Sequence, residues 1–274
     1  YILFFTDKGK CYWVKVYDIP EGGRAAKGRA IVNLIGCEPD EKVSAFIGVK
    51  QDQFHDDHFV VMATEKGIVK KTKLSAYSNP RKKGIYAVEI REGDSLIEAR
   101  VSNGENDILL GTTNGKSIRF SEEQIRPSGR KTMGVKGITL SSKDDKVVGM
   151  LLIKREGTVL VATENGFGKR TEIIQYRAQK RGGKGVLTMK TTDKIGKMIT
   201  IKEVVGTDDL MIIRDDGVLI RMPVSQIRSI GRATQGVKLI KLAEGTKVSA
   251  ITRIISEEEK TADEPENNPE SQDA

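Results

Sequence analysis

The chain has 274 residues, of which 38% are hydrophobic and 31% are charged, and its formal net charge is +8. This composition suffices for a hydrophobic interior, and no apolar run reaches the roughly 18 residues needed to cross a membrane. No signal peptide is recognisable after the first residue, Tyr1, and we expect a fragment of a longer protein. Cys11 and Cys37 form neither a metal-binding spacing nor a disulfide framework, which favours a reduced, cytoplasmic setting.

The positive charge is unevenly distributed along the chain. Residues 256–274 contain eight acids and one base, a formal charge of −7, so residues 1–255 carry +15. A strongly basic body favours a polyanionic partner, although a merely soluble basic protein would have the same composition. The acidic segment contains two prolines and no aromatic residue, and we predict that it is a disordered tail.

A strand followed by a tight turn recurs five times between residues 1 and 255. The segments are ILFFTDKG, VVMATEKG, ILLGTTNG, VLVATENG and LMIIRDDG, which end at Gly9, Gly67, Gly115, Gly166 and Gly217, and the last three glycines are spaced by 51 residues. Lys-Gly, Asn-Gly or Asp-Gly at a strand end predicts a hairpin whose glycine has a positive φ. A short alternating strand follows each turn, as in Ser117–Phe120.

A second glycine follows each turn glycine at a nearly fixed distance. It lies 19 residues later at Gly28, Gly134, Gly185 and Gly236, and 17 residues later at Gly84. We expect a third strand there (AIVNLI, IYAVEI, VKGITL, VLTMK and VKLIKL), a fourth strand that closes each unit, and single helical turns at TKLSAY, SEEQI, TEIIQY and VSQI.

These repeats predict an all-β, propeller-like β-pinwheel of five four-stranded blades, followed by the acidic tail. The expected blades cover residues 1–50, 58–102, 106–154, 157–204 and 207–254, with the domain spanning 1–255 and the tail 256–274.

The sequence offers no arrangement of catalytic residues, and we expect no cofactor or metal in this chain. The only histidines, His55 and His58, lie close together, and two neighbouring ligands without a distant partner seldom bind a metal. Residues 111–117, GTTNGKS, resemble a phosphate-binding loop, but three residues separate the glycines where four are required. We therefore interpret this segment as a hairpin turn.

Cations recur at fixed positions of the units. Four residues after the turn glycine, four of the five units have a cation, Lys71, Arg119, Arg170 and Arg221, and the first unit has Trp13. Four residues before the second glycine come Arg24, Arg130, Arg181 and Arg232, with Arg81 displaced by one. Nearby loops add Lys27, Arg29, Lys82, Lys83, Lys131, Lys136, Lys180, Lys184 and Lys238. Because blades repeat radially, equivalent positions lie on one rim, and we predict a continuous basic band there. Cations scattered over a merely solvated surface would not recur at equivalent positions of the repeats.

A basic band of this kind is expected to contact the phosphates of duplex DNA rather than its bases. Aromatic residues are only 5% of the chain, which argues against stacking on single-stranded bases. A curved rim that follows the duplex over several blades must also bend it.

The densest loop is Gln179-Lys180-Arg181-Gly182-Gly183-Lys184-Gly185. Three glycines allow close approach to a phosphate with amide donors available, although a flexible connector is the simpler interpretation. The loop resembles the QRRGGKG-type box of the A protein of bacterial DNA gyrase, a type IIA topoisomerase. The segments of the ATENG-x-x-K-[KR]-T and GR-x-TQGV types are similar to the blades of its C-terminal β-pinwheel domain, over all five units and the tail.

This resemblance implies that the domain wraps duplex DNA, with chiral bias, as part of an enzyme in which gyrase A and gyrase B form a heterotetramer. That enzyme introduces negative supercoils with ATP and Mg²⁺, and its breakage tyrosine and ATP site lie outside this chain. The family usually has six blades with the box in the first, so we expect a further blade upstream.

Three alternatives remain at this stage. The C-terminal domain of the corresponding topoisomerase IV protein has similar blades without a good box. A propeller scaffold for proteins, of the WD-repeat kind, would have mixed rims and Trp-Asp dipeptides, and a P-loop enzyme would need the loop excluded above.

Overall fold

Each repeat begins with the predicted hairpin. The computed structural model describes residues 1–23, 26–55, 57–79, 81 and 83–254. The hairpins are β1–β2 (Ile2–Thr6, Lys10–Val14), β4–β5 (Phe59–Thr64, Ile68–Lys73), β8–β9 (Asp107–Thr112, Lys116–Ser121), β12–β13 (Thr158–Thr163, Phe167–Glu172) and β16–β17 (Asp209–Arg214, Leu219–Pro223). The segment that resembled a phosphate-binding loop is the β8–β9 hairpin, with Gly111 opposite Ser117. All five turn glycines have φ between 74° and 83°, as predicted.

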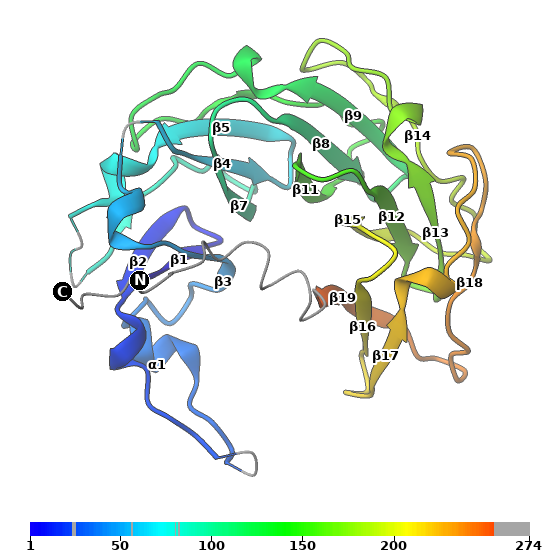
Figure 1. Cartoon of the computed structure of the whole chain (residues 1–274), viewed down its shortest axis with the longest axis horizontal. Helices are drawn as coiled ribbons and strands as arrows, with labels where there is room; N and C mark the ends of the chain where they lie inside the picture. The colour runs from blue at the N-terminus through cyan, green and yellow to red at the C-terminus, as the bar shows by residue number, and fades with distance from the viewer. Residues whose placement is uncertain (24–25, 56, 80, 82, 255–274) are drawn as a thin grey trace, which may run out of the picture.

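The last strand of each unit pairs antiparallel with the first strand of its own hairpin. These strands are β3 (Val43–Gly48), β7 (Leu96–Ser102), β11 (Val147–Ile153), β15 (Met198–Val204) and β19 (Val248–Ile254). They lie at one edge of each sheet and on the inner side of the molecule, and we call them the inner strands (Figure 1).

In units two to five, the third strand joins the preceding unit. These outer strands are β6 (Ile85–Tyr86), β10 (Val135–Lys136), β14 (Val186–Leu187) and β18 (Val237–Lys238). The sheet orders are β3-β1-β2-β6, β10-β5-β4-β7, β11-β8-β9-β14 and β15-β12-β13-β18, while the fifth sheet, β17-β16-β19, has three strands. The four-stranded blades are therefore built by exchange, not by the four strands of a single unit.

The second glycine of units two to five allows this exchange. Gly185 has a φ of 68°, and a Cβ there would lie 2.3 Å from the carbonyl oxygen of Ser117 on β9. The outer strand β14 can approach the hairpin of the preceding unit only because this side chain is absent.

The third segment of the first unit is helical, contrary to the expected strand. AIVNLI forms α1 (Ile31–Ile35), ended by Gly36 in the left-handed conformation with a φ of 60°. Among the described residues the segment pairs with no strand, and Ile35 packs with Phe4, Tyr12 and Val14 of the first sheet. Burial of one apolar face therefore decides the conformation.

The hydrophobic core lies between consecutive sheets. On β12, Val159 and Val161 pack towards the third sheet, whereas Leu160 and Ala162 pack towards the fifth. Successive side chains of a strand point to opposite faces, so the first strand of an interior hairpin must be apolar throughout. This explains why the first strands of these hairpins are continuous apolar runs in the sequence.

Single 3-10 turns follow the hairpins, four of them as predicted, and the turn after the first hairpin was not among those expected. They are η1 (Val16–Asp18), η3 (Leu74–Tyr77), η4 (Glu122–Gln124), η5 (Ile173–Gln175) and η6 (Val224–Gln226), and η2 (Gln51–Gln53) joins the first two units. Within the described ranges, no helix is long and apolar enough to span a membrane.

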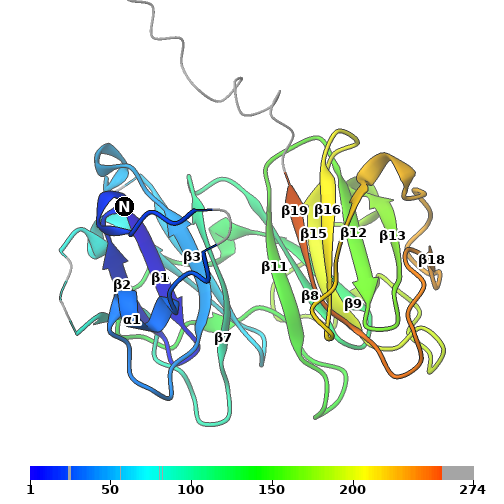
Figure 2. The same ribbon diagram turned by 90° about the horizontal axis from the view of Figure 1, so that it is seen from below.

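The five sheets follow one another along an arc (Figure 1). Seen from below, the sheet of β1–β3 lies on one side of the molecule, and the sheets that contain β12 and β16 lie on the other (Figure 2). The outer strands and the loops that precede them run along the convex edge. Strand exchange thus repeats the same loop at successive points of one curved rim.

The turn glycines are testable as conformational requirements. Gly115 has a φ of 74°, and a Cβ there would lie 2.1 Å from the carbonyl oxygen of Met189. We expect Gly115→Ala to lower the free energy of unfolding by about 2–3 kcal/mol, measured by denaturant unfolding. Gly129→Ala is the control, because its Cβ would meet nothing within 4 Å, and equal losses in the two variants would contradict this assignment.

Candidate nucleic-acid interface

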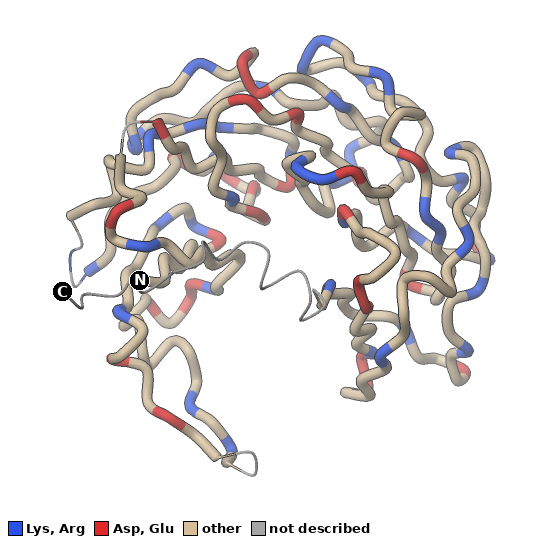
Figure 3. Tube along the Cα trace, in the orientation of Figure 1, with Lys and Arg blue, Asp and Glu red and all other residues tan. Residues whose placement is uncertain are grey.

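Four equivalent loops precede the outer strands on the convex edge of the arc, and we call them the rim loops. Their described residues are 78–79, 81 and 83–84 in the first, 128–134 in the second, 179–185 in the third and 230–236 in the fourth. Lys and Arg positions recur along this edge (Figure 3). The rim loops are therefore the first place to look for contacts with a polyanion.

Loop 179–185 is held against the preceding unit by its backbone. The Gln179 amide donates to Arg119 O at 2.8 Å, and the Gly182 amide donates to Gly137 O at 2.7 Å. The hydroxyl of Thr139 donates to Gly182 O at 2.6 Å. The Arg181 amide donates to the Gln124 side chain at 2.9 Å. These three loop amides have partners inside the protein, which corrects the expectation that the amides stand free to bind phosphate.

The cations of this loop differ in how they are held. Lys180 and Lys184 are exposed. Arg181 is half-buried, with Nε donating to Gln124 O at 3.0 Å and Nη1 donating to Lys136 O at 3.1 Å. The two lysines therefore project charge from the rim, while Arg181 also fastens the loop to β10.

The arginine four residues before the second glycine makes the same contact in three units. Its Nη1 donates to a carbonyl oxygen of an outer strand: Arg130 to Tyr86 O at 3.4 Å, Arg181 to Lys136 O, and Arg232 to Leu187 O at 2.9 Å. A guanidinium has five N–H donors, so one or two such bonds leave donors for a phosphate. The predicted register is thus present as a row of arginines, each joined to the strand before it.

The cations four residues after the turn glycine are mostly turned into the protein. The Lys71 ammonium is buried 3.5 Å from Glu122 Oε2. Arg119 pairs with Asp107 at 2.7 Å and donates to the carbonyls of Ile173 and Tyr176, both at 3.3 Å.

Arg170 and Arg221 occupy the same position in the last two units. Arg170 Nε donates to Ile227 O of the next unit at 2.7 Å. Arg221, in the last unit, pairs with Asp209 at 2.6 Å and remains largely exposed. We predicted from the sequence that Lys71, Arg119 and Arg170 belong to the basic band. In the structure these three side chains contact the following unit instead, because this position of the hairpin faces that unit.

The remaining predicted cations lie at two places. Arg81, Lys83, Lys131, Lys136 and Lys238 are exposed on rim loops or outer strands, and Lys27 and Arg29 are exposed just before α1. Arg24, Lys82 and the acidic segment 256–274 lie outside the described residues. His58, which we did not expect to bind a metal, has its Nδ1 atom 2.8 Å from Asp57 Oδ1.

Two buried lysines organise the rim loops and were missed in the sequence. Lys70 Nζ donates to Ala87 O at 2.7 Å and to Arg130 O at 2.5 Å. Lys169 Nζ donates to Gly231 O at 2.7 Å and also to Arg232 O. Both lysines have relative exposures of at most 1%. Each fastens the backbone of a rim loop, directly at the arginine that reaches the outer strand.

A signal for these lysines was present. Lys70 precedes Lys71, and Lys169 precedes Arg170. Side chains of a strand alternate between its two faces, and both faces of an interior hairpin are covered by neighbouring units, so adjacent cations on its second strand must both find partners inside the protein. Burial lowers the pKa of Lys70 and of Lys169 to about 8, with a further contribution from the nearby guanidinium of Arg130 or Arg232.

The lowered pKa values predict a pH-dependent stability. Between pH 8 and about 10.5 the unfolded lysine binds a proton that the folded lysine has lost, so the free energy of unfolding should rise with pH. We expect Lys169→Met to flatten this rise by at most about 1.4 kcal/mol per pH unit, measured by denaturant unfolding at pH 7.5–10.5. The exposed Lys143→Met is the control. A profile for Lys169→Met identical to that of the control would count against the assignment.

Comparisons with known proteins agree with this architecture. The family model of the DNA gyrase C-terminal domain, beta-propeller, matches residues 1–48, 58–103, 106–154, 157–204 and 208–254. The chain is 44% identical to the DNA gyrase A protein of Staphylococcus epidermidis over 261 residues, which cover 94% of this chain and 29% of that protein. It is also 44% identical to the Staphylococcus aureus protein over 268 residues, covering 97% and 30%. The chain thus spans about three tenths of these relatives.

Two solved structures share the fold. The C-terminal domain of DNA topoisomerase IV has a TM-score of 0.84 at 23% identity, covering 93% of this chain and 79% of that one. A DNA gyrase A C-terminal domain has a TM-score of 0.80 at 21% identity, covering 93% and 82%. Since the family model matches all five units, the chain belongs to the DNA gyrase C-terminal domain family of β-propellers.

Proposed function

We propose that this domain binds duplex DNA along its convex rim and bends or wraps the duplex around the arc. The observation that carries the proposal is the repeated rim loop, in which exposed lysines accompany an arginine fastened to an outer strand. Strand exchange places these loops at successive points of one curved edge. A row of separated cations on a curved edge suits a phosphate backbone better than a single small ligand.

The proposed contact set is smaller than the sequence suggested. The cations that we expect to face DNA are Arg81, Lys83, Arg130, Lys131, Lys180, Arg181, Lys184 and Arg232, with Lys27 and Arg29 beyond the first sheet. Lys71, Arg119 and Arg170 act indirectly, because they hold consecutive units in register. Gln179 and the three glycines of its loop shape the backbone that carries Lys180 and Lys184.

Bending follows from the curvature of the rim. Smooth bending of 20–30 base pairs by 40–90° costs on the order of 1–6 kcal/mol, which contacts at several loops must offset. Phosphate contacts fix position without reading sequence, so little sequence preference is expected.

In the whole protein, we infer that this domain serves DNA gyrase A. The support is the 44% identity to gyrase A proteins over nearly the whole chain. In this role it would work in the cytoplasm with the rest of gyrase A and with gyrase B in a heterotetramer that supercoils DNA negatively using ATP and Mg²⁺. The catalytic residues and the ATP site would lie outside this chain.

A topoisomerase IV role is the second candidate. Its support is the TM-score of 0.84 to a topoisomerase IV C-terminal domain. At 23% identity that likeness concerns the fold alone, so we favour the gyrase role.

The phosphate contacts are testable by their salt dependence. We expect the logarithm of the affinity for a duplex of about 40 base pairs to fall linearly with the logarithm of salt concentration. Each phosphate contact adds about 0.9 to the slope for duplex DNA. Measurement by fluorescence anisotropy from about 50 to 300 mM salt would decide, and an affinity independent of salt would contradict the proposal.

The contribution of loop 179–185 is testable with two exposed lysines. We expect Lys180→Ala together with Lys184→Ala to reduce that slope by about 2, because two phosphate contacts are lost. Lys42→Ala with Lys143→Ala is the matched control, since both side chains are exposed but precede inner strands. If both double variants behave alike, this loop only connects the strands.

A further inference from the structure

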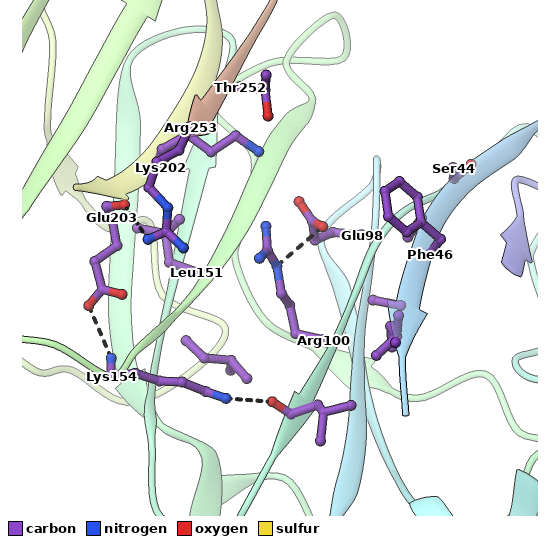
Figure 4. Close-up of a pocket in the computed structure, with 16 residues that line it drawn as sticks. Ser44, Phe46, Glu98, Arg100, Leu151, Lys154, Lys202, Glu203, Thr252 and Arg253 are labelled. Atoms are coloured by element: carbon purple, nitrogen blue, oxygen red, sulfur yellow. Dashed lines mark hydrogen bonds and ion pairs between the residues drawn. The ribbon is translucent and has the colours of Figure 1, made fainter. Parts of the chain in front are cut away.

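A cavity lies on the inner side of the arc, away from the rim. Its volume is about 600 Å³, and its walls come from the inner strands β3, β7, β11, β15 and β19 and the residues that follow β11. Figure 4 shows that Arg100, Lys202 and Arg253 reach into this space from three of these strands. The cavity therefore gathers side chains of all five units at one place.

Cations outnumber acids around this cavity. Four cations line it, Arg100, Lys154, Lys202 and Arg253, against two acids, Glu98 and Glu203. The formal charge of the lining is therefore +2.

The two acids are already engaged. Glu203 Oε1 accepts hydrogen bonds from the backbone amides of Lys154 and Arg155, each at 3.0 Å. Glu98 Oε1 lies 3.3 Å from Arg100 Nε. Glu98 therefore faces Arg100, while Glu203 is held by backbone amides and keeps its charge, so the two acids offset only half of the positive charge of the lining.

The partners of two other cations are neutral. Lys154 Nζ donates to Val101 O at 2.9 Å, and Arg253 Nη1 donates to Glu203 O at 3.1 Å. A carbonyl accepts a proton donor but does not cancel its charge. Lys154 is exposed and Arg253 is half-buried. Glu203 acts on both charges, with Glu122 acting on Lys154 and Asp208 on Arg253, but no carboxylate of the described residues is hydrogen-bonded to either cation.

The titration of these groups reflects the same surplus. Burial lowers the pKa of Lys202, and the positive charges of Arg100 and Arg253 lower it further. The negative charge of Glu98 raises this pKa and so opposes the change. Burial also lowers the pKa of Lys154, again with a contribution from Arg100, while Glu122 and Glu203 oppose this change. An anion in the cavity would favour the charged form of every one of these side chains.

We propose that this cavity binds a small multivalent oxyanion, held by Arg100, Lys202 and Arg253. Phosphate oxygens suit the site because guanidinium groups bind them through parallel hydrogen bonds, and an ammonium adds a point charge. The anion would join three inner strands electrostatically. The site is independent of the proposed DNA-binding rim, which lies on the opposite edge of the sheets.

Two sources could supply this chemistry. One is a free anion such as pyrophosphate. The other is the chain itself, since residues 256–274 follow β19 directly and contain eight acids. Both present closely spaced anionic oxygens, so the experiment must separate them.

Titration calorimetry of the full chain with sodium pyrophosphate tests the site. We expect one binding site in the wild type, and at least about tenfold weaker binding in Lys202→Met and in Arg100→Gln, because each removes a charged partner of the anion. The rim variant Lys180→Ala with Lys184→Ala is the control and should bind pyrophosphate as the wild type does. Binding that is lost in the rim variant but kept in Lys202→Met would overturn the proposal.

A variant with its eight tail acids changed to the corresponding amides separates the sources. Tighter pyrophosphate binding by this variant means that the chain's own carboxylates compete for the cavity. Unchanged binding means that a free anion is the ligand, and both results support the site. Absence of binding in both this variant and the wild type would overturn it.

Thermal unfolding shows whether the cavity variants remain folded. We expect the melting temperature of Lys202→Met without ligand to equal or exceed that of the wild type, because the variant lacks a half-buried charge that Arg100 and Arg253 repel. Added pyrophosphate should raise the melting temperature of the wild type only. An equal rise in Lys202→Met would contradict the assignment of the anion to this cavity.

Discussion

The pairing of each outer strand with the hairpin of the preceding unit determines the rest of this structure. Outer strands of only two residues, such as β14, complete the sheets and connect consecutive units. They can do so because a glycine such as Gly185 brings the backbone against the neighbouring hairpin. Apolar contacts on both faces of strands such as β12 then stack the sheets. Because the exchange is the same at each step, one loop is repeated along one curved edge.

The cations follow from this arrangement and divide into three groups. Some connect units, as Arg119 does when it donates to carbonyls of the fourth unit. Others are buried beneath the rim loops, where Lys169 binds carbonyls around Arg232. A third group, which includes Lys184, is exposed on the rim. A basic body of +15 is therefore only partly a binding surface, because much of its charge holds the scaffold that presents the remainder.

The repeats, the hairpins and the positive φ of the turn glycines could be predicted from the sequence, since each depends on local chemistry. Strand exchange could not, because a two-residue strand carries no mark of the hairpin that it joins. The helix at Ile31–Ile35 has a strand-like composition and depends on which sheet lies beside it. The directions of Lys71 and Arg170 depend on acceptors in the next unit. The burial of Lys70 could have been inferred, since neighbouring units cover both faces of an interior hairpin.

The central claim is that the rim bends duplex DNA along the arc, and DNA topology measures this most directly. Relaxed circular plasmid would be incubated with increasing amounts of the chain, treated with a type I topoisomerase, freed of protein and resolved by gel electrophoresis. We predict that the linking-number distribution shifts in one direction, in proportion to bound protein. A distribution that stays unchanged when the plasmid is saturated with protein would contradict wrapping.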